Sequence, residues 1–161
     1  MLPVSILATA FVLTSPEIAA GGIIPRDQVW NHDGCDGTNV APRLRWHGAP
    51  SATKSFALIM FDPDAPTGHG WYHWIVVDLP AQADAIGPRV RPPAREGRND
   101  FGTLGYGGPC PPPGGAHRYV FTLYALAIPH LPAVRASGPA VEAAIRSHVL
   151  ETATLTGRFG R

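Results

Sequence analysis

Residues 61–79 read FDPDAPTGHGWYHWIVVDL, and this stretch decides the fold that we expect. The nearly continuous apolar run of residues 55–61 leads into it, and residues 71–79 are again rich in apolar side chains, which is typical of two buried strands. Between them lies a loop of prolines, glycines, aspartates and histidines. Because proline fixes φ and glycine allows positive φ, this loop is stiff and stands outside a sheet ladder. We therefore expect its polar side chains to bind a ligand.

Strict alternation predicts which side chains share a face of each long strand. In residues 71–79 one face is predicted to carry Trp71, His73, Ile75, Val77 and Leu79. In residues 117–126 one face is predicted to carry His117, Tyr119, Phe121, Leu123 and Ala125. Shorter strands are expected at residues 11–15, 43–46 and 153–159.

The composition is typical of a mostly β protein with long loops, because the 161 residues include 18 glycines and 18 prolines without any period. One helix is predicted, over residues 137–151, with Pro139 in its first turn. Its apolar stripe consists of Val141, Ala144, Ile145, His148 and Val149. No linker interrupts the chain, so we expect a single domain over residues 1–161.

The charge pattern argues against several classes of partner. The net charge is +1 and only 16% of residues are charged, whereas nucleic-acid and acidic membrane partners favour a basic patch. No apolar run reaches the length of about 18 residues that a membrane-spanning helix needs, so we expect no membrane span. The apolar start lacks a basic segment before it, which disfavours a cleaved signal peptide.

Two predicted strands begin with a histidine directly after a rigid loop, namely His73 and His117. If both strands belong to one sheet, the two imidazoles meet at one edge, below Asp62 and Asp64. A neighbouring carboxylate raises the pKa of an imidazole, and the protonated form is a receptor for phosphate or sulfate. The apolar walls would come from Trp71 and Tyr119. The alternative is that both histidines are satisfied core or rim residues and both aspartates only form turns.

Metal binding and nucleophilic catalysis have weaker support. His69 and His73 are four residues apart, but a zinc site of this spacing needs a helix and a glutamate between the histidines, and the sequence offers neither. No Gly-x-Ser-x-Gly elbow is present. We expect no metal and no cofactor.

Two cysteines, Cys35 and Cys110, each lie in a predicted turn. A disulfide between them would tie an early loop to the proline-rich loop beside the proposed pocket. In a cytosolic protein they would instead be reduced thiols.

Several motifs together resemble the phosphatidylethanolamine-binding protein family, in its bacterial and archaeal Raf-kinase-inhibitor-like branch. Residues 62–66 followed by 71–74 resemble the first family signature, and residues 111–114 with 117–119 resemble the second. Residues 13–16, 35–39 and 153–161 also resemble bacterial members, so the likeness runs from about Phe11 to the C-terminus. It implies an antiparallel β-sandwich with one C-terminal helix and an anion pocket at one end.

The resemblance also implies site residues. Asp62, His73 and His117 match the pocket residues of the family, and the walls would be Trp71, Pro111, Pro112 and Tyr119. Because the likeness begins near Phe11, only ten residues remain for a leader, and we expect a cytoplasmic protein, the alternative being a periplasmic or secreted one. Similarity to bacterial members further suggests a homodimer.

We expect a non-enzymatic module that binds a small anion or a phosphorylated ligand and regulates a partner protein. One alternative is an inhibitor of a protease or kinase that acts by protein contact. Another is an enzyme that uses the Asp62, His73 and His117 cluster for acid–base chemistry on a small molecule. Fold alone does not choose between them.

Overall fold

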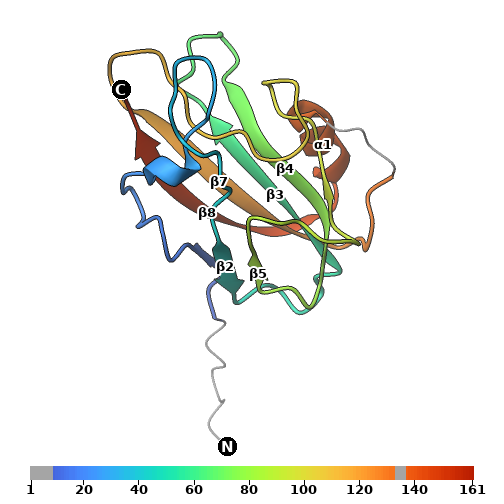
Figure 1. Cartoon of the computed structure of the whole chain (residues 1–161). Helices are drawn as coiled ribbons and strands as arrows, with labels where there is room; N and C mark the ends of the chain where they lie inside the picture. Colours follow the sequence, from blue (N-terminus) through green and yellow to red (C-terminus); the bar gives the residue numbers. More distant parts are fainter. Residues whose placement is uncertain (1–8, 133–136) are drawn as a thin grey trace, which may run out of the picture.

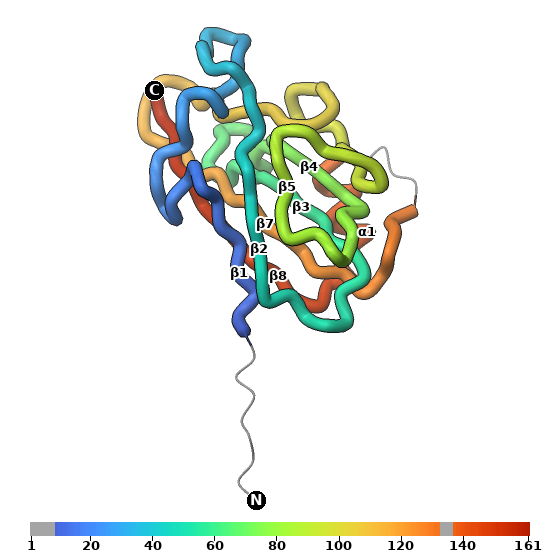
Figure 2. Tube along the Cα trace, turned by 60° about the horizontal axis from the view of Figure 1, so that its bottom comes forward, coloured from blue at the N-terminus to red at the C-terminus, as the bar shows by residue number. Residues whose placement is uncertain are grey.

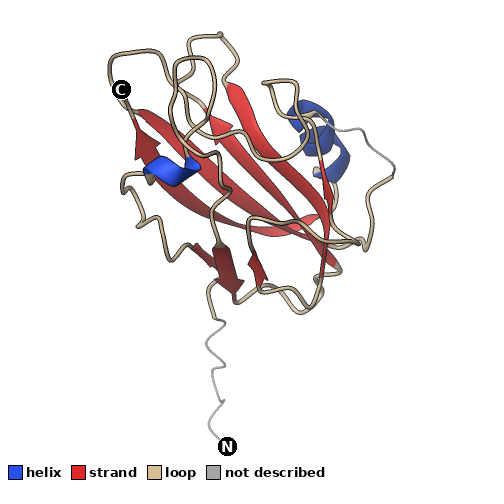
Figure 3. Cartoon of the chain, in the orientation of Figure 1, coloured by secondary structure: helices blue, strands red, loops and turns tan. Residues whose placement is uncertain are grey.

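The strands form two antiparallel sheets that pack face to face (Figures 1 and 3). The structure is a computed structural model, and it describes residues 9–132 and 137–161. The smaller sheet has the order β1 (Val12–Thr14), β2 (Leu44–His47) and β5 (Ala85–Ile86). The larger sheet has the order β6 (Arg95–Glu96), β4 (Trp71–Pro80), β3 (Ser55–Asp62), β7 (His117–Leu126) and β8 (Val149–Phe159). A 3₁₀ helix, η1 (Arg26–Gln28), and one α-helix, α1 (Gly138–Ile145), complete the described elements. The predicted β-sandwich with one helix is therefore confirmed.

Strand β3 is the centre of the larger sheet because its side chains are apolar on both faces, as its continuous apolar run predicts. Phe56, Leu58 and Met60 face the core between the two sheets. Ala57 and Ile59 face a second core, which α1 covers. Figure 2 shows the smaller sheet crossing the larger one on the side opposite to α1. A strand covered on both faces in this way cannot tolerate a polar side chain without a partner.

Strand β4 is interrupted by a bulge at His73. Trp74 pairs with Met60 and Tyr72 pairs with Phe61, so that His73 has no partner in β3. An extra residue of this kind bends the strand and redirects side chains. Trp74 packs between the sheets, whereas Tyr72 packs on the side of α1.

A second register shift lies near Asp78, which has a φ of 59°. Because of it, Ile75 and Val77 pack under α1 while Leu79 packs between the sheets. The single face predicted for residues 71–79 is therefore wrong, since strict alternation holds only between bulges. In β7, by contrast, the predicted face of Tyr119 and the apolar residues that follow it is confirmed in the core between the sheets.

Helix α1 is shorter than the predicted range of residues 137–151. It ends at Ile145, and Val149 already pairs with Leu126 in the larger sheet. Val141 and Ile145 are buried against the sheet as the predicted stripe requires. The error arises because Val149 continues the helical spacing of apolar residues although it serves β8. No helix among the described residues is long and apolar enough to cross a membrane.

One end of the sandwich gathers the loops that matter for function (Figure 1). The loop between β3 and β4, the loops around residues 32–36 and 97–113, and the C-terminal residues meet there. Strand β7 begins at this end, where His117 pairs with Phe159 of β8.

Candidate functional site

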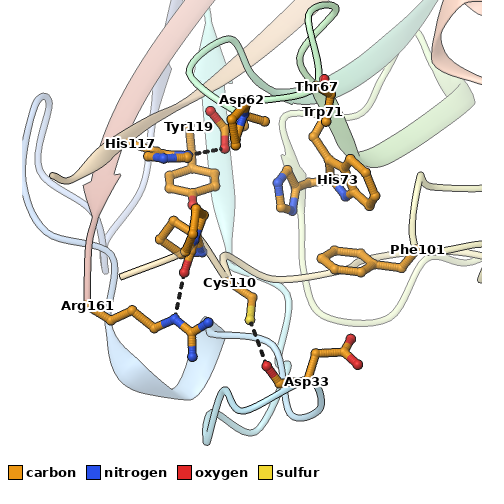
Figure 4. Close-up of a pocket in the computed structure, with 14 residues that line it drawn as sticks. Asp33, Asp62, Thr67, Trp71, His73, Phe101, Cys110, His117, Tyr119 and Arg161 are labelled. Carbon is orange, nitrogen blue, oxygen red and sulfur yellow. Dashed lines mark hydrogen bonds and ion pairs between the residues drawn. The ribbon is translucent and has the colours of Figure 1, made fainter. Parts of the chain in front are cut away.

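A cavity of about 340 Å³ opens among these loops (Figure 4). Of the residues that the sequence singled out, those that line it are Asp62, Trp71, His73, Cys110, Pro111, Pro112, His117 and Tyr119. They come from the end of β3, the bulged start of β4, the proline-rich loop and the start of β7. The antiparallel pairing of β3 with both β4 and β7 brings these three strand ends together.

Asp62 and His117 form a pair at one side of the cavity. The Nδ1 of His117 lies 2.7 Å from Oδ2 of Asp62, and their side chains are only 12% and 4% exposed. The other carboxylate oxygen, Oδ1, accepts a hydrogen bond from the backbone N–H of Asp64 at 2.8 Å. The carboxylate is thus fixed by its own loop, and it holds the ring of His117 in one orientation.

His73 is buried, and its Nδ1 lies 2.6 Å from the backbone carbonyl oxygen of Gly107. Burial lowers its pKa to about 4, and this effect outweighs the hydrogen bond and the charge of Asp62, which act in the opposite direction. The ring is therefore neutral at pH 7, its Nδ1–H donates to Gly107, and its Nε2 can accept a hydrogen bond. Our expectation of a protonated His73 is wrong, because the sequence does not show how deeply the ring is buried.

Two residues that line the cavity each carry a buried polar atom that the described residues leave without a hydrogen-bond partner. They are the hydroxyl of Tyr119 and the indole N–H of Trp71, and both atoms are buried. Burial raises the pKa of Tyr119, so its hydroxyl stays protonated and can donate. Native proteins satisfy nearly all such atoms, so groups of this kind at a cavity wall indicate a place for a ligand or a water molecule.

Asp64, a predicted ligand-binding residue, does not line the cavity. It forms a two-pronged ion pair with Arg118, with 2.8 Å between Oδ1 and Nη2 and 3.0 Å between Oδ2 and Nε. The hydrogen bonds from Arg118 lower the pKa of the Asp64 carboxyl to about 2. The structure therefore gives Asp64 the role of fixing the loop against β7.

Sequence reasoning missed Phe101, which forms the wall opposite Tyr119 (Figure 4). Its ring centroid lies 5.5 Å from that of His73 and 5.4 Å from that of Trp71, with the rings edge to face. The neighbouring Asp100 positions Phe101. The backbone N–H of Asp100 donates to the carbonyl oxygen of Tyr72 at 2.9 Å, and its carboxylate accepts from the N–H of Tyr72 at 2.7 Å. In the sequence, the one signal for this role was an aspartate next to an aromatic residue in the long loop of residues 97–113.

Asp33 and Arg161 also line the cavity and were missed. Asp33 accepts a hydrogen bond from the indole of Trp30 at 3.0 Å. Arg161 donates to the carbonyl oxygens of Pro111 and Gly34 at 2.6 and 2.9 Å. Both lie far in sequence from residues 61–79, and no local pattern indicates that they reach the cavity.

In the structure Cys35 and Cys110 are joined by a disulfide, with their Cα atoms 5.9 Å apart. Cys110 lines the cavity, whereas Cys35 is buried beside Val29 and Trp30. The bond connects the loop of residues 32–36 to the proline-rich loop. Within residues 9–132 and 137–161 no group of three or more histidine, cysteine, aspartate or glutamate side chains is placed to hold a metal ion.

Known proteins are similar to this chain in both sequence and fold. The model of the phosphatidylethanolamine-binding protein family matches residues 14–160. The protein YbcL of Escherichia coli is 41% identical over 159 residues, which cover 92% of this chain and 87% of YbcL. The protein YbhB of the same organism is 41% identical over 155 residues, which cover 91% of this chain and 98% of YbhB.

Solved structures agree with this assignment. The crystal structure of E. coli YbcL, described as a member of the mammalian family, gives a TM-score of 0.90 at 39% identity and covers 94% of this chain and 98% of that chain. The structure of the homologue CT736 from Chlamydia trachomatis gives a TM-score of 0.83 at 32% identity. The match covers 94% of this chain and 98% of CT736. This chain therefore belongs to the phosphatidylethanolamine-binding protein family.

Proposed function

We propose that the cavity binds a small oxyanion that carries a proton, such as the monoanion of a phosphate monoester. The observation that carries this proposal is the neutral His73 at the cavity wall, next to the Asp62–His117 pair. The Nε2 of His73 and the carboxylate of Asp62 accept hydrogen bonds. A ligand that contacts them must therefore donate one.

Other groups of the wall donate and so favour oxygen atoms on the same ligand. They would include the Tyr119 hydroxyl and the Trp71 indole N–H, which belong to lining residues but are themselves buried, so a ligand reaches them only after a small side-chain movement. Residues 109–113 read PCPPP, so Cys110 carries the one backbone N–H of this segment. A hydrogen phosphate group meets both requirements, because it has a P–OH donor and several acceptor oxygens. The cavity volume of about 340 Å³ lies at the lower end of the range of small-molecule sites, which favours a compact ligand.

Calorimetric titration tests the proposal with inorganic phosphate, phosphorylethanolamine and sulfate. Sulfate has nearly the shape of phosphate but carries no proton at neutral pH. At pH 6 we expect the two phosphates to bind and sulfate to bind at least tenfold more weakly. Affinity for phosphorylethanolamine should fall as the pH rises above about 6, where phosphate monoesters lose their second proton.

His73→Ala is the matching variant, and His47→Ala is its control, since His47 is an exposed residue of β2 and does not line the cavity. We expect weaker phosphate binding in His73→Ala and unchanged binding in His47→Ala. Equal phosphate affinity of wild type and His73→Ala would remove the cavity assignment. Equal binding of sulfate and phosphate would refute the requirement for a proton. Conversion of phosphorylethanolamine to a product would favour the acid–base enzyme instead.

A further inference from the structure

The charges around the cavity do not by themselves favour an anion. Its wall includes two carboxylates, Asp33 and Asp62, and Asp62 is engaged with His117. His73 is neutral. Among the described residues that line the cavity, Arg161 is the one lysine or arginine. Without it, an anionic ligand would meet a wall that carries carboxylates and no permanent positive charge.

Arg161 is held in place by hydrogen bonds that leave part of its guanidinium group available. Its Nε donates to the carbonyl oxygen of Pro111 at 2.6 Å, and its Nη1 donates to that of Gly34 at 2.9 Å. The hydrogen bonds of the described residues do not use Nη2. No carboxylate of the described residues forms an ion pair with Arg161. Guanidinium groups bind phosphate through their fork of N–H donors, and a preset guanidinium loses little entropy on binding.

The two carbonyl groups that hold Arg161 belong to loops that the disulfide also joins. Gly34 precedes Cys35, and Pro111 follows Cys110. Arg161 therefore spans the same two loops as the covalent bond, one residue away on each side. In Figure 4 its guanidinium lies at the end of the cavity where Cys110 and Asp33 also lie. Separation of the loops would remove at least one of its two anchors.

We propose that Arg161 is the residue that recognises the negative charge of the ligand, and that the loops joined by Cys35 and Cys110 hold it at the cavity. This inference rests on the proposed function, because it names the charge partner within the same site. It assigns a role to a residue whose side-chain hydrogen bonds go to Pro111 and Gly34 and for which the sequence predicted no site role.

The test is calorimetric titration of inorganic phosphate at pH 6 into wild type, Arg161→Gln, Arg161→Lys and Arg158→Gln. Arg158 is the matched control because it is an exposed arginine of β8, three residues away, that does not line the cavity. We expect at least tenfold weaker phosphate binding in Arg161→Gln and a change below twofold in Arg158→Gln. Arg161→Lys should lie between them, because it keeps the charge but loses the fork of donors. Added sodium chloride should weaken phosphate binding by wild type more than by Arg161→Gln.

The outcomes separate the two claims. If Arg161→Gln binds phosphate as tightly as wild type while His73→Ala binds it more weakly, this inference is overturned and the proposed function stands. Equal loss in Arg161→Gln and Arg158→Gln also overturns it, because the effect would then be the general field of the protein. Absence of phosphate binding by wild type overturns both claims.

A double-mutant cycle tests the part played by the loops. With both cysteines changed to serine, we expect phosphate to bind at least threefold more weakly. In that background Arg161→Gln should reduce phosphate affinity by less than the tenfold expected in the wild type, because the guanidinium has already lost its fixed position. A tenfold effect in both backgrounds would overturn the role of the loops. Thermal unfolding of each variant confirms that it is folded under the conditions of the titration.

Discussion

Two tyrosines of the core offer the sharpest test of the site, because the same substitution should have opposite effects on stability. The hydroxyl of Tyr119 is buried without a partner among the described residues. The hydroxyl of Tyr106 is also buried, but it donates to the backbone carbonyl of Gln28 at 2.9 Å. Changing each tyrosine to phenylalanine removes one oxygen atom and leaves the ring.

The expected free energies follow from these contacts. A buried polar group without a partner costs about 1–3 kcal/mol, so Tyr119→Phe removes that cost. The void left by one oxygen, about 10–15 Å³, offsets about 0.3 kcal/mol of the gain at about 24 cal/mol per Å³. We therefore expect Tyr119→Phe to raise the free energy of unfolding by about 1–2 kcal/mol. Tyr106→Phe should lower it by about 1–2 kcal/mol, since the Gln28 carbonyl loses its buried donor.

Urea unfolding in phosphate-free buffer measures both changes. In thermal unfolding they should appear as shifts of roughly 2–4 °C per kcal/mol, upward for Tyr119→Phe and downward for Tyr106→Phe. Tyr119→Phe should also bind phosphate more weakly than wild type, so that stability rises while binding falls. If Tyr119→Phe is destabilised as much as Tyr106→Phe, its hydroxyl is satisfied in the free protein and the reasoning about an unpartnered donor is refuted.

Three further predictions concern other parts of the molecule. Because burial lowers the pKa of His73 to about 4, below the ordinary value of 6.5, the unfolded chain binds a proton between these pH values that the folded chain does not bind. Stability should therefore fall as the pH drops from 6.5 to 4, by up to about 1.4 kcal/mol per pH unit from this group, and the fall should be smaller in urea titrations of His73→Gln; identical pH profiles would show that His73 is charged in the fold. The wild type should show no free thiol in denaturant without reductant, and changing both Cys35 and Cys110 to serine should cost about 4 kcal/mol for the 75-residue separation; two titratable thiols in the wild type would contradict the disulfide. Gly138→Ala should destabilise the protein by about 1 kcal/mol or more, because its Cβ would lie 2.0 Å from the ring of Tyr72 and such overpacking outweighs the better helix propensity of alanine; a raised unfolding temperature would show that α1 can shift away from the ring.

The long strands follow from the sequence, because apolar or alternating runs flank stiff loops. The meeting of Asp62 with His117 was one of two interpretations of these runs, and the family resemblance favoured it. The bulges at His73 and Asp78 do not follow from the sequence, since the pairing of neighbouring strands creates them. They decide which side chains of β4 face which core. Period-two reasoning therefore succeeded in β7 and failed in β4.

The protonation state of His73 was missed for a related reason. Its hydrogen-bond partner is the carbonyl of Gly107, which a distant loop carries to the ring. Asp62, which we expected to charge the ring, pairs instead with His117. Tertiary contacts of this kind leave no trace in local patterns, and no local pattern shows that Phe101 or Arg161 reaches the cavity. By contrast, loop composition alone was enough to suggest a pocket beside residues 61–79.

The hydrogen bond between Arg161 and Gly34 joins residues 127 positions apart, and it has a consequence for how the protein is made. Ribosomes deliver a chain from its N-terminus, so the loop of residues 32–36 can join Cys110 before β8 exists, but it gains its bond to Arg161 only at the end of synthesis. Strand β8 also receives the segment of residues 21–24, through backbone bonds from Gly21 to Thr156 and from Ile24 to Arg158. A nascent chain that lacks β8 therefore leaves residues 21–24 without these backbone partners and the loop of residues 32–36 without its bond to Arg161. Both segments therefore complete their hydrogen bonds only through long-range pairing, which is intrinsically slow.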